Sequence, residues 1–304
     1  MQSIYLVMPS STLRILRAAH LGMCFGVRDA IDLAVQRADT TPLTILGDLV
    51  HNDAVLASLR SRGIASVTDP ARVTTRTVMV TAHGASERSR ARSRALGLEI
   101  VDATCPLVDV AHRAVQALVR DHYHPVIIGQ RGHVEVRGLT EDLDAFDVVL
   151  DETDVLALAP RPRLGVAAQT TQPIDTVRRL VGCIRRRFPD ADVCFVDTVC
   201  RPTKQRQAAA IDLARQADLV IVVGGASSNN TRRLVETCSL YCARVHHVQT
   251  DADLCADWFR GTETVGLTAG TSTPDEVVDR VESRIRSFAQ GHNAGVTDRR
   301  EAAR

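Results

Sequence analysis

Short apolar or β-branched runs alternate with longer amphipathic stretches along almost the whole chain. The runs have the length and composition of buried strands and lie at 43–46, 77–80, 126–128, 164–168, 219–223 and 265–267. The stretches between them carry apolar residues at helical spacing and include 28–37, 108–120, 174–187 and 203–217. This alternation is typical of parallel α/β folds. The periodicity stops after Phe288, so we predict a disordered tail at 289–304.

A coarse threefold repeat lies on top of this alternation. The segments RILRAAHLGMCFGV, LEIVDATCPLV and DVCFVDTVCRPT each run from a strand-like stretch through a cysteine into a helical stretch, which places Cys24, Cys105 and Cys200 at equivalent junctions. Parallel α/β sheets bind ligands at the carboxyl ends of their strands, and a helix N-terminus lowers the pKa of a thiol. We therefore predict three similar α/β domains, at 14–105, 106–199 and 200–288, packed around a pseudo-threefold axis where three thiolates meet.

Composition and charge exclude several other classes of protein. Lys and Arg number 37 and Asp and Glu number 36, so no overall field favours binding to nucleic acid or to a membrane surface. We find neither a secretory signal nor an apolar run long enough to span a bilayer. Eight cysteines without a signal indicate a reducing compartment, which predicts a cytoplasmic protein with free thiols. No CxxC pair occurs, and this disfavours a zinc finger.

Three converging thiolates suit an iron-sulfur cluster better than zinc. A 4Fe-4S cube normally takes four cysteines, so three would leave one iron open to substrate. The alternative is that each cysteine is a small buried residue at a tight junction. The remaining cysteines follow no repeat, and we interpret them as structural: Cys183, Cys194, Cys238, Cys242 and Cys255.

Polar residues that suit an anion follow several of the predicted strands. His51, His83 and His133 each lie beside Gly or Asn in a loop-like context, and the clusters GGASSNNTRRL and LTAGTSTPDEV each follow a strand and precede a helix. Backbone N–H groups and hydroxyls in such places bind phosphate. The alternative is that the histidines are surface or capping residues and that Ser228 or Thr273 is an ordinary N-cap.

The motifs MCFGV, HN, AHG, DATCP, HxEVxG, AQTTQ, DTVC, SxNTRRL and TAGTSTPD follow one another in this order. From about Arg14 to Phe288 the chain thereby resembles the hydroxymethylbutenyl diphosphate reductases of the non-mevalonate isoprenoid pathway. The resemblance implies a three-domain trefoil with a central 4Fe-4S cluster held by Cys24, Cys105 and Cys200. It also implies reduction of 4-hydroxy-3-methylbut-2-enyl diphosphate to isopentenyl and dimethylallyl diphosphate, with ferredoxin or flavodoxin as electron donor.

Carried over motif by motif, the resemblance assigns roles to further residues. Glu135 is the implied proton source, and an extended segment would place it on the same side as His133. Thr170 and Thr203 are implied to order water and substrate beside the cluster. The diphosphate is implied to be bound by His51, His83, His133, Ser228, Asn229, Asn230 and Ser272.

The sequence also departs from the family pattern. Val134 stands where proline is usual, Arg201 and Pro202 replace an uncharged residue and an alanine, and Ala226 and Ser227 replace a Lys-Asn pair. These changes bear on the rate, on the product ratio and on the identity of the substrate. Three alternatives remain at this stage: a paralogue acting on another allylic diphosphate, a cluster-binding protein without turnover, and a metal-free diphosphate-binding protein.

Overall fold

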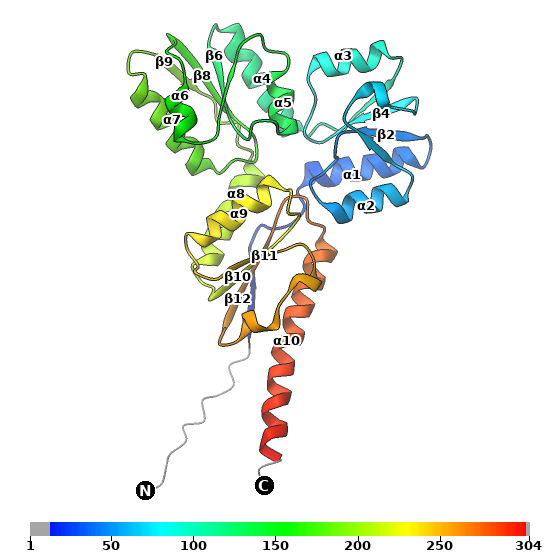
Figure 1. Cartoon of the computed structure of the whole chain (residues 1–304), viewed down its shortest axis with the longest axis vertical. Helices are drawn as coiled ribbons and strands as arrows, with labels where there is room; N and C mark the ends of the chain where they lie inside the picture. The colour runs from blue at the N-terminus through cyan, green and yellow to red at the C-terminus, as the bar shows by residue number, and fades with distance from the viewer. Residues whose placement is uncertain (1–12, 302–304) are drawn as a thin grey trace.

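The computed structural model describes residues 13–301, with side chains for 13–288, and forms three α/β units (Figure 1). Each unit is built on one four-stranded sheet, and every strand pair is parallel. The first sheet contains β2 (Leu43–Leu46), β3 (Ala65–Val67), β4 (Thr77–Val80) and β5 (Glu99–Asp102). The second contains β6 (His124–Ile128), β7 (Asp147–Val149), β8 (Arg163–Ala168) and β9 (Asp192–Phe195). The third contains β1 (Arg14–Arg17), β10 (Leu219–Val223), β11 (Val245–Val248) and β12 (Thr264–Ala269).

Helices cover the sheets and fill the connections between strands. The first unit has α1 (Phe25–Ala38), α2 (Asp53–Ser61), the 3₁₀ turn η1 (Pro70–Arg72) and α3 (Glu87–Ala95). The second has α4 (Pro106–Arg120), α5 (Val134–Thr140), α6 (Glu152–Ala157) and α7 (Ile174–Arg187). The third has α8 (Arg201–Ala214), α9 (Asn229–Ser239), η2 (Asp251–Asp253), η3 (Ala256–Phe259) and α10 (Asp275–Glu301). The predicted α/β class and each predicted strand and helix are confirmed.

Strand β10 shows why the sequence runs are continuously apolar. Ile221 packs on the side of the sheet that faces α10, whereas Val220 and Val222 pack on the side that faces α8 and α9. All three residues have no exposed surface. A strand that is buried on both faces needs apolar residues at every position, because successive side chains point to opposite faces.

The three sheets share one strand order, but the chain enters the third sheet twice. The orders are β3-β2-β4-β5, β7-β6-β8-β9 and β11-β10-β12-β1. The fourth strand of the third sheet is therefore β1, whose Arg14 pairs with Thr264. The predicted first domain, 14–105, thus begins too early: β1 belongs to the third unit. An edge strand of four residues carries no sequence signal for a partner about 250 residues away.

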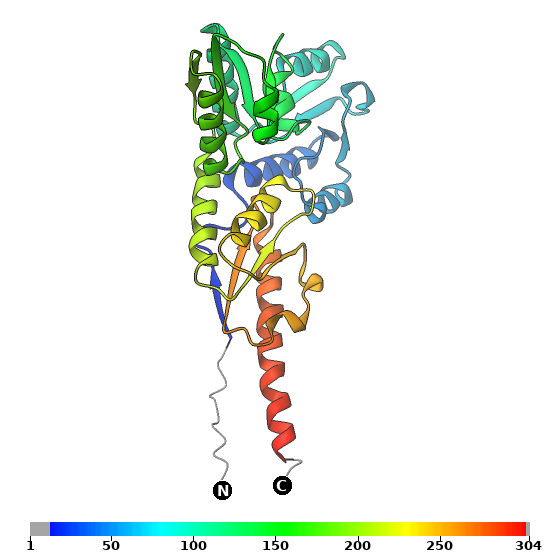
Figure 2. The ribbon, with the colours of Figure 1, turned by 60° about the vertical axis from the view of Figure 1, so that its left-hand side comes forward.

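The end of the chain also differs from the prediction. We expected disorder from 289 onward, whereas α10 continues as a helix to Glu301. Figures 1 and 2 show its C-terminal part extending away from the three units. The loss of apolar periodicity after Phe288 therefore does not mark the end of the helix. Residues 302–304 lie outside the described residues. Within 13–301, no helix combines the length and the hydropathy needed to cross a membrane.

Candidate active site

Each of the three predicted cysteines is the N-cap of the helix that opens the next unit. Cys24 precedes α1, Cys105 precedes α4 and Cys200 precedes α8, and none of the three side chains makes a capping hydrogen bond. The chain thus leaves the fourth strand of one sheet, passes a cysteine and begins the first helix of the next unit. The free thiols remain available to a ligand at the point where the units meet.

Equivalent backbone hydrogen bonds fix the three cysteines. Each cysteine N–H donates to a carbonyl just beyond the third strand of the sheet that the chain is leaving. The N···O distances are 3.1 Å from Cys24 to Thr271, 3.0 Å from Cys105 to Ala82 and 3.0 Å from Cys200 to Thr170. The three repeats in the sequence therefore fold into equivalent backbone arrangements around the three cysteines.

The three cysteines line one cavity of about 70 Å³. Its other lining residues include three that the family resemblance singled out, Glu135, Thr170 and Thr203. Gly26 makes room for the cysteines: a Cβ atom on Gly26 would lie 2.5 Å from the Sγ atom of Cys105. Three thiols around a space kept open by a missing side chain are a fitting site for a cluster with three protein ligands.

The expected lowering of the thiol pKa is wrong for two of the cysteines. Burial raises the pKa of Cys105 and of Cys200 above the ordinary thiol value, even though hydrogen bonds at the helix starts act in the opposite direction. Desolvation of the thiolate outweighs the helix N-terminus because these side chains are partly removed from water. Cys200 Sγ also lies 3.1 Å from the hydroxyl of Thr203.

The three histidines form a second cluster next to the cysteines. Their ring centroids are 5.1 Å apart for His51 and His83, 5.3 Å for His51 and His133, and 5.4 Å for His83 and His133. They line a cavity of about 30 Å³ together with the predicted residues Ser228, Asn229, Asn230 and Ser272. The two cavities adjoin, because both are lined by Val27, His83, Thr171 and Thr271.

Several polar atoms in the histidine cavity are buried and have no hydrogen-bond partner. They are His51 Nε2, His83 Nδ1, Asn229 Nδ2 and Asn230 Nδ2. Unsatisfied buried polar groups cost stability, and native proteins keep few of them unless a ligand uses them. The two amide nitrogens can only donate hydrogen bonds, so this cavity is suited to an anion.

His133 shows how the chain orients one of these donors. Its Nδ1 accepts the N–H of Glu135 at 3.1 Å, which makes His133 the N-cap of α5. In the neutral imidazole the proton must then lie on Nε2, where it can be donated to a ligand. The expected extended segment over 133–135 is wrong, because His133 is the N-cap and Val134 and Glu135 begin α5. The cap joins the ring of His133 to the backbone N–H of Glu135.

Burial keeps the histidines neutral. Desolvation lowers the pKa of His133 to about 4, lowers that of His51, and lowers that of His83 well below its usual value. Neighbouring positive charge acts in the same direction, from Arg232 on His51 and His133. The cavity therefore offers neutral donors before any anion enters it.

The carboxyl group of Glu135 is buried and hydrogen-bonds to one residue, Thr170. It accepts the N–H of Thr170 at 2.6 Å and the hydroxyl of Thr170 at 3.0 Å, and only 1% of the residue is exposed. Desolvation raises the pKa of Glu135 to about 7, although both bonds from Thr170 favour the ionised form. The group can therefore carry a proton near neutral pH.

A metal ion is the other ligand that the three histidines could take. One ring nitrogen from each lies within 4.8 Å of the others, a spacing that would also suit a metal. The surrounding amide donors do not ligate metals through nitrogen, and α9 directs its N-terminus here, capped by Ser228, whose hydroxyl accepts the N–H of Thr231. The donor set as a whole favours an anion.

The structure brings together every predicted site residue and adds some that the sequence did not single out. Thr171 and Thr271 line both cavities, and Phe25 lines the cysteine cavity while remaining 46% exposed. The two threonines lie within motifs that we quoted, AQTTQ and TAGTSTPD, so their motif membership was the available signal. All eight cysteines are free, and the five interpreted as structural line neither cavity.

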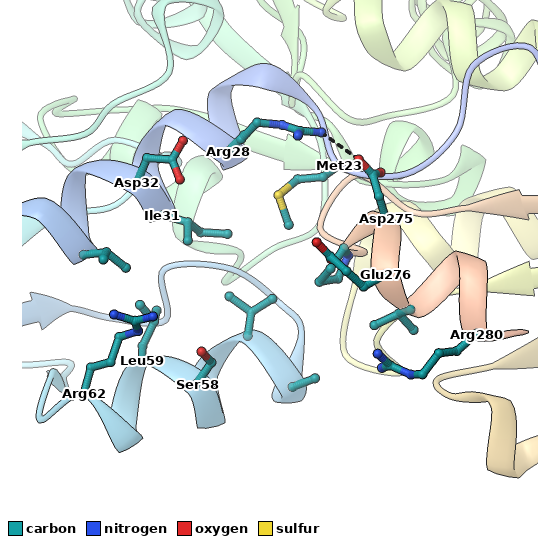
Figure 3. A pocket seen from close by; sticks show the side chains of 15 residues that line it. Met23, Arg28, Ile31, Asp32, Ser58, Leu59, Arg62, Asp275, Glu276 and Arg280 are labelled. Atoms are coloured by element: carbon teal, nitrogen blue, oxygen red, sulfur yellow. Dashed lines mark hydrogen bonds and ion pairs between the residues drawn. The ribbon is translucent and has the colours of Figure 1, made fainter.

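A larger hollow of about 490 Å³ lies between α1, α2 and the start of α10 (Figure 3). Arg28 and Asp275 form an ion pair across it at 3.2 Å. None of the predicted site residues lines it, although Met23 directly precedes Cys24. The candidate site is therefore distinct from this hollow.

Fold and site define a three-unit α/β protein with a cysteine-lined central cavity and an adjoining cavity for an anion. Comparison with known families is specific: the model of the LytB protein family matches residues 15–286. The chain belongs to the LytB family.

Curated relatives match over most of their length. A 4-hydroxy-3-methylbut-2-enyl diphosphate reductase of Trichlorobacter lovleyi is 37% identical, with 92% of this chain and 100% of the relative covered. An enzyme of the same name from Aquifex aeolicus is 34% identical, with 91% and 97% covered.

Solved structures match as well. The E-1-hydroxy-2-methyl-but-2-enyl-4-diphosphate reductase of Plasmodium falciparum aligns with a TM-score of 0.84 at 28% identity, covering 90% of this chain and 87% of the other. A second structure, of (E)-4-hydroxy-3-methyl-but-2-enyl diphosphate reductase, the terminal enzyme of the non-mevalonate pathway, aligns with a TM-score of 0.64 at 32% identity, covering 90% and 99%.

Proposed function

We propose that the chain is an oxidoreductase that holds a 4Fe-4S cluster and reduces 4-hydroxy-3-methylbut-2-enyl diphosphate to isopentenyl and dimethylallyl diphosphate. The observation that carries the proposal is that every residue implied by the family resemblance lines one of two adjoining buried cavities. In the reaction, two electrons and two protons enter, the allylic C–O bond breaks, the hydroxyl leaves as water, and one of two allylic carbons gains a hydrogen.

Cys24, Cys105 and Cys200 are the proposed cluster ligands. Their convergence on one cavity and the close approach of Gly26 to Cys105 support this assignment. When bound, the cluster supplies the electrons and a Lewis-acidic iron that has no protein ligand. The protein contributes the thiolates, excludes water and positions the substrate beside them.

The diphosphate is proposed to bind in the histidine cavity. The buried donors of His51, His83, Asn229 and Asn230 would then gain the hydrogen-bond partners that they otherwise lack. Ser228, Ser272 and the Nε2–H of His133 complete the donor set. Binding at this end places the short carbon chain of the substrate toward the cysteines, because the two cavities adjoin.

Glu135 is the proposed proton donor. It is buried, it lines the cysteine cavity, and Thr170 holds both of its carboxyl oxygens. A protonated carboxylic acid at this place can donate to the departing hydroxyl, which would otherwise leave as hydroxide. Thr203 lies beside Cys200 in the lining of the cysteine cavity, where its hydroxyl can orient water or substrate.

Electrons must arrive from outside the chain, and we propose ferredoxin or flavodoxin as the donor because both deliver single electrons. Phe25 follows Cys24, lines the cysteine cavity and is exposed, so the proposed cluster lies close to a surface that such a donor can reach. We also propose a cytoplasmic location, since cysteine ligands need a reducing compartment.

Product analysis tests the function. Anaerobically reconstituted enzyme, supplied with reduced ferredoxin or with a chemical reductant, should convert the C5 alcohol diphosphate to both named products, identified by mass spectrometry. A cluster-loaded enzyme that leaves this substrate unchanged but reduces a longer allylic diphosphate would indicate the paralogue. A loaded protein with no product would indicate a binding role. A protein that takes up no iron would indicate the metal-free alternative.

A further inference from the structure

A buried arginine is hydrogen-bonded to the backbone two residues away from each of two proposed cluster ligands. Arg206, on α8, is 7% exposed. Its Nε and Nη2 atoms donate to the carbonyl of Gly22 at 3.0 and 2.8 Å, and its Nη1 atom donates to the carbonyl of Pro202 at 3.2 Å. Gly22 lies two residues before Cys24, and Pro202 lies two residues after Cys200.

No carboxylate neutralises this guanidinium. Among the ion pairs formed by residues 13–288, none includes Arg206. A buried cation without a counter-ion is costly, and buried arginines in folded proteins are normally paired. The acidic groups that act on it are the thiols of Cys24 and Cys200, whose attraction opposes the desolvation that lowers the pKa of Arg206.

We propose that Arg206 is the counter-ion of the cysteine-bound centre and that its fixed positive charge makes that centre easier to reduce. The inference rests on the proposed cluster. Three thiolates bring three negative charges to one cavity, and each added electron makes the centre more negative. A cation that is held in place and shielded from water stabilises the reduced form more than the oxidised form.

A purely structural role is the competing explanation. The three hydrogen bonds tie the segment before Cys24 to the start of α8, and the geometry of these bonds depends on the guanidinium fork. A lysine variant separates the two explanations, because Arg206→Lys keeps the positive charge but loses the planar guanidinium group that makes the three hydrogen bonds. Arg206→Gln loses the charge. Arg215→Gln is the matched control, since Arg215 is an exposed arginine at the C-terminal end of the same helix.

The experiment is a redox titration of full-length, anaerobically reconstituted protein, followed by electron paramagnetic resonance, with iron content and thermal unfolding measured in parallel. We expect Arg206→Gln to lower the ratio of reduced to oxidised cluster at a given potential by about tenfold, which equals a shift of about 59 mV toward negative potential for a one-electron couple. Arg206→Lys should stay within about threefold of the wild type, and Arg215→Gln should match it.

Equal potentials in Arg206→Gln and the wild type would overturn the proposal, as would equal shifts in the Gln and Lys variants. If Arg206→Gln fails to retain iron, Arg206→Lys decides: a loaded Lys variant with near wild-type potential supports the counter-ion, and loss of iron in both variants shows a structural tie. A wild-type protein that takes up no cluster would refute the proposed function itself. A protein that is loaded with cluster but whose reduction potential does not change when Arg206 is replaced would refute only the role of Arg206.

Discussion

Replacing Gly26 by alanine is the sharpest test of how the cysteine cavity is built. The new Cβ would lie 2.5 Å from Cys105 Sγ and 2.9 Å from Cys105 Cβ, whereas ordinary van der Waals contact begins near 3.4 Å. Cys105 or the start of α1 must therefore move by about 1 Å. Metal–ligand distances tolerate only about 0.2 Å, so we expect affinity for the cluster to fall about 10- to 100-fold.

The Gly26→Ala change also separates an effect on cluster binding from an effect on the stability of the whole protein. Alanine is favoured over glycine within a helix by about 1 kcal/mol, while forcing a methyl group into a filled space costs about 1–3 kcal/mol. Gly182 on α7 is the control, because an added Cβ there would meet an Arg186 nitrogen at an ordinary contact distance of 3.5 Å. Iron content and cluster absorbance after reconstitution measure the effect. Full and unaltered cluster loading in Gly26→Ala, equal to Gly182→Ala, would refute the reasoning.

Three further predictions concern the acid and the anion site. Glu135→Gln should keep the cluster spectrum but lower turnover by about 10²- to 10⁴-fold in an anaerobic product assay, and undiminished turnover would remove Glu135 from proton donation. The pKa of Glu135 in the folded protein is about 7, above its ordinary value of 4.5, so its contribution to stability is fully present below pH 4.5 and is lost as pH rises through 7. In denaturant unfolding, the free energy of unfolding of Glu135→Gln should rise relative to that of the wild type by up to about 3 kcal/mol between pH 4.5 and pH 8. A difference that does not change with pH would contradict this. Asn230→Ala should bind inorganic pyrophosphate at least about tenfold more weakly than the wild type, because a buried hydrogen-bond donor is lost. Isothermal titration calorimetry measures this affinity. The control Ala226→Ser, in the exposed loop, should bind pyrophosphate as the wild type does.

Local patterns in the sequence made much of this architecture predictable. The strand, cysteine, helix pattern at Cys24, Cys105 and Cys200 is contained within about a dozen residues, and each cysteine occupies the N-cap position of the helix that follows it. The buried strands were visible because both faces of each sheet are covered, which requires unbroken apolar runs. The order of the strands and helices along the chain and the burial of the apolar strands were therefore predictable from residue types.

Features that depend on distant contacts were not readable. Strand β1 pairs with β12, which lies about 250 residues later in the sequence, and completes the third sheet. Nothing in the four residues of this edge strand encodes that partner. The thiol pKa values depend on burial by all three units, which outweighs the local helix start. Arg206 appears in the sequence as one more basic residue on a helix; only the tertiary structure shows that it is buried beside Gly22 without a carboxylate.

The central claim is that three thiolates hold a cluster with one iron left open to ligand. Mössbauer spectroscopy of the anaerobically reconstituted, ⁵⁷Fe-labelled protein, with and without the C5 alcohol diphosphate, tests it most directly. We predict one iron site that differs from the other three and that changes when the substrate is added. Four equivalent sites that do not respond to substrate would contradict the account.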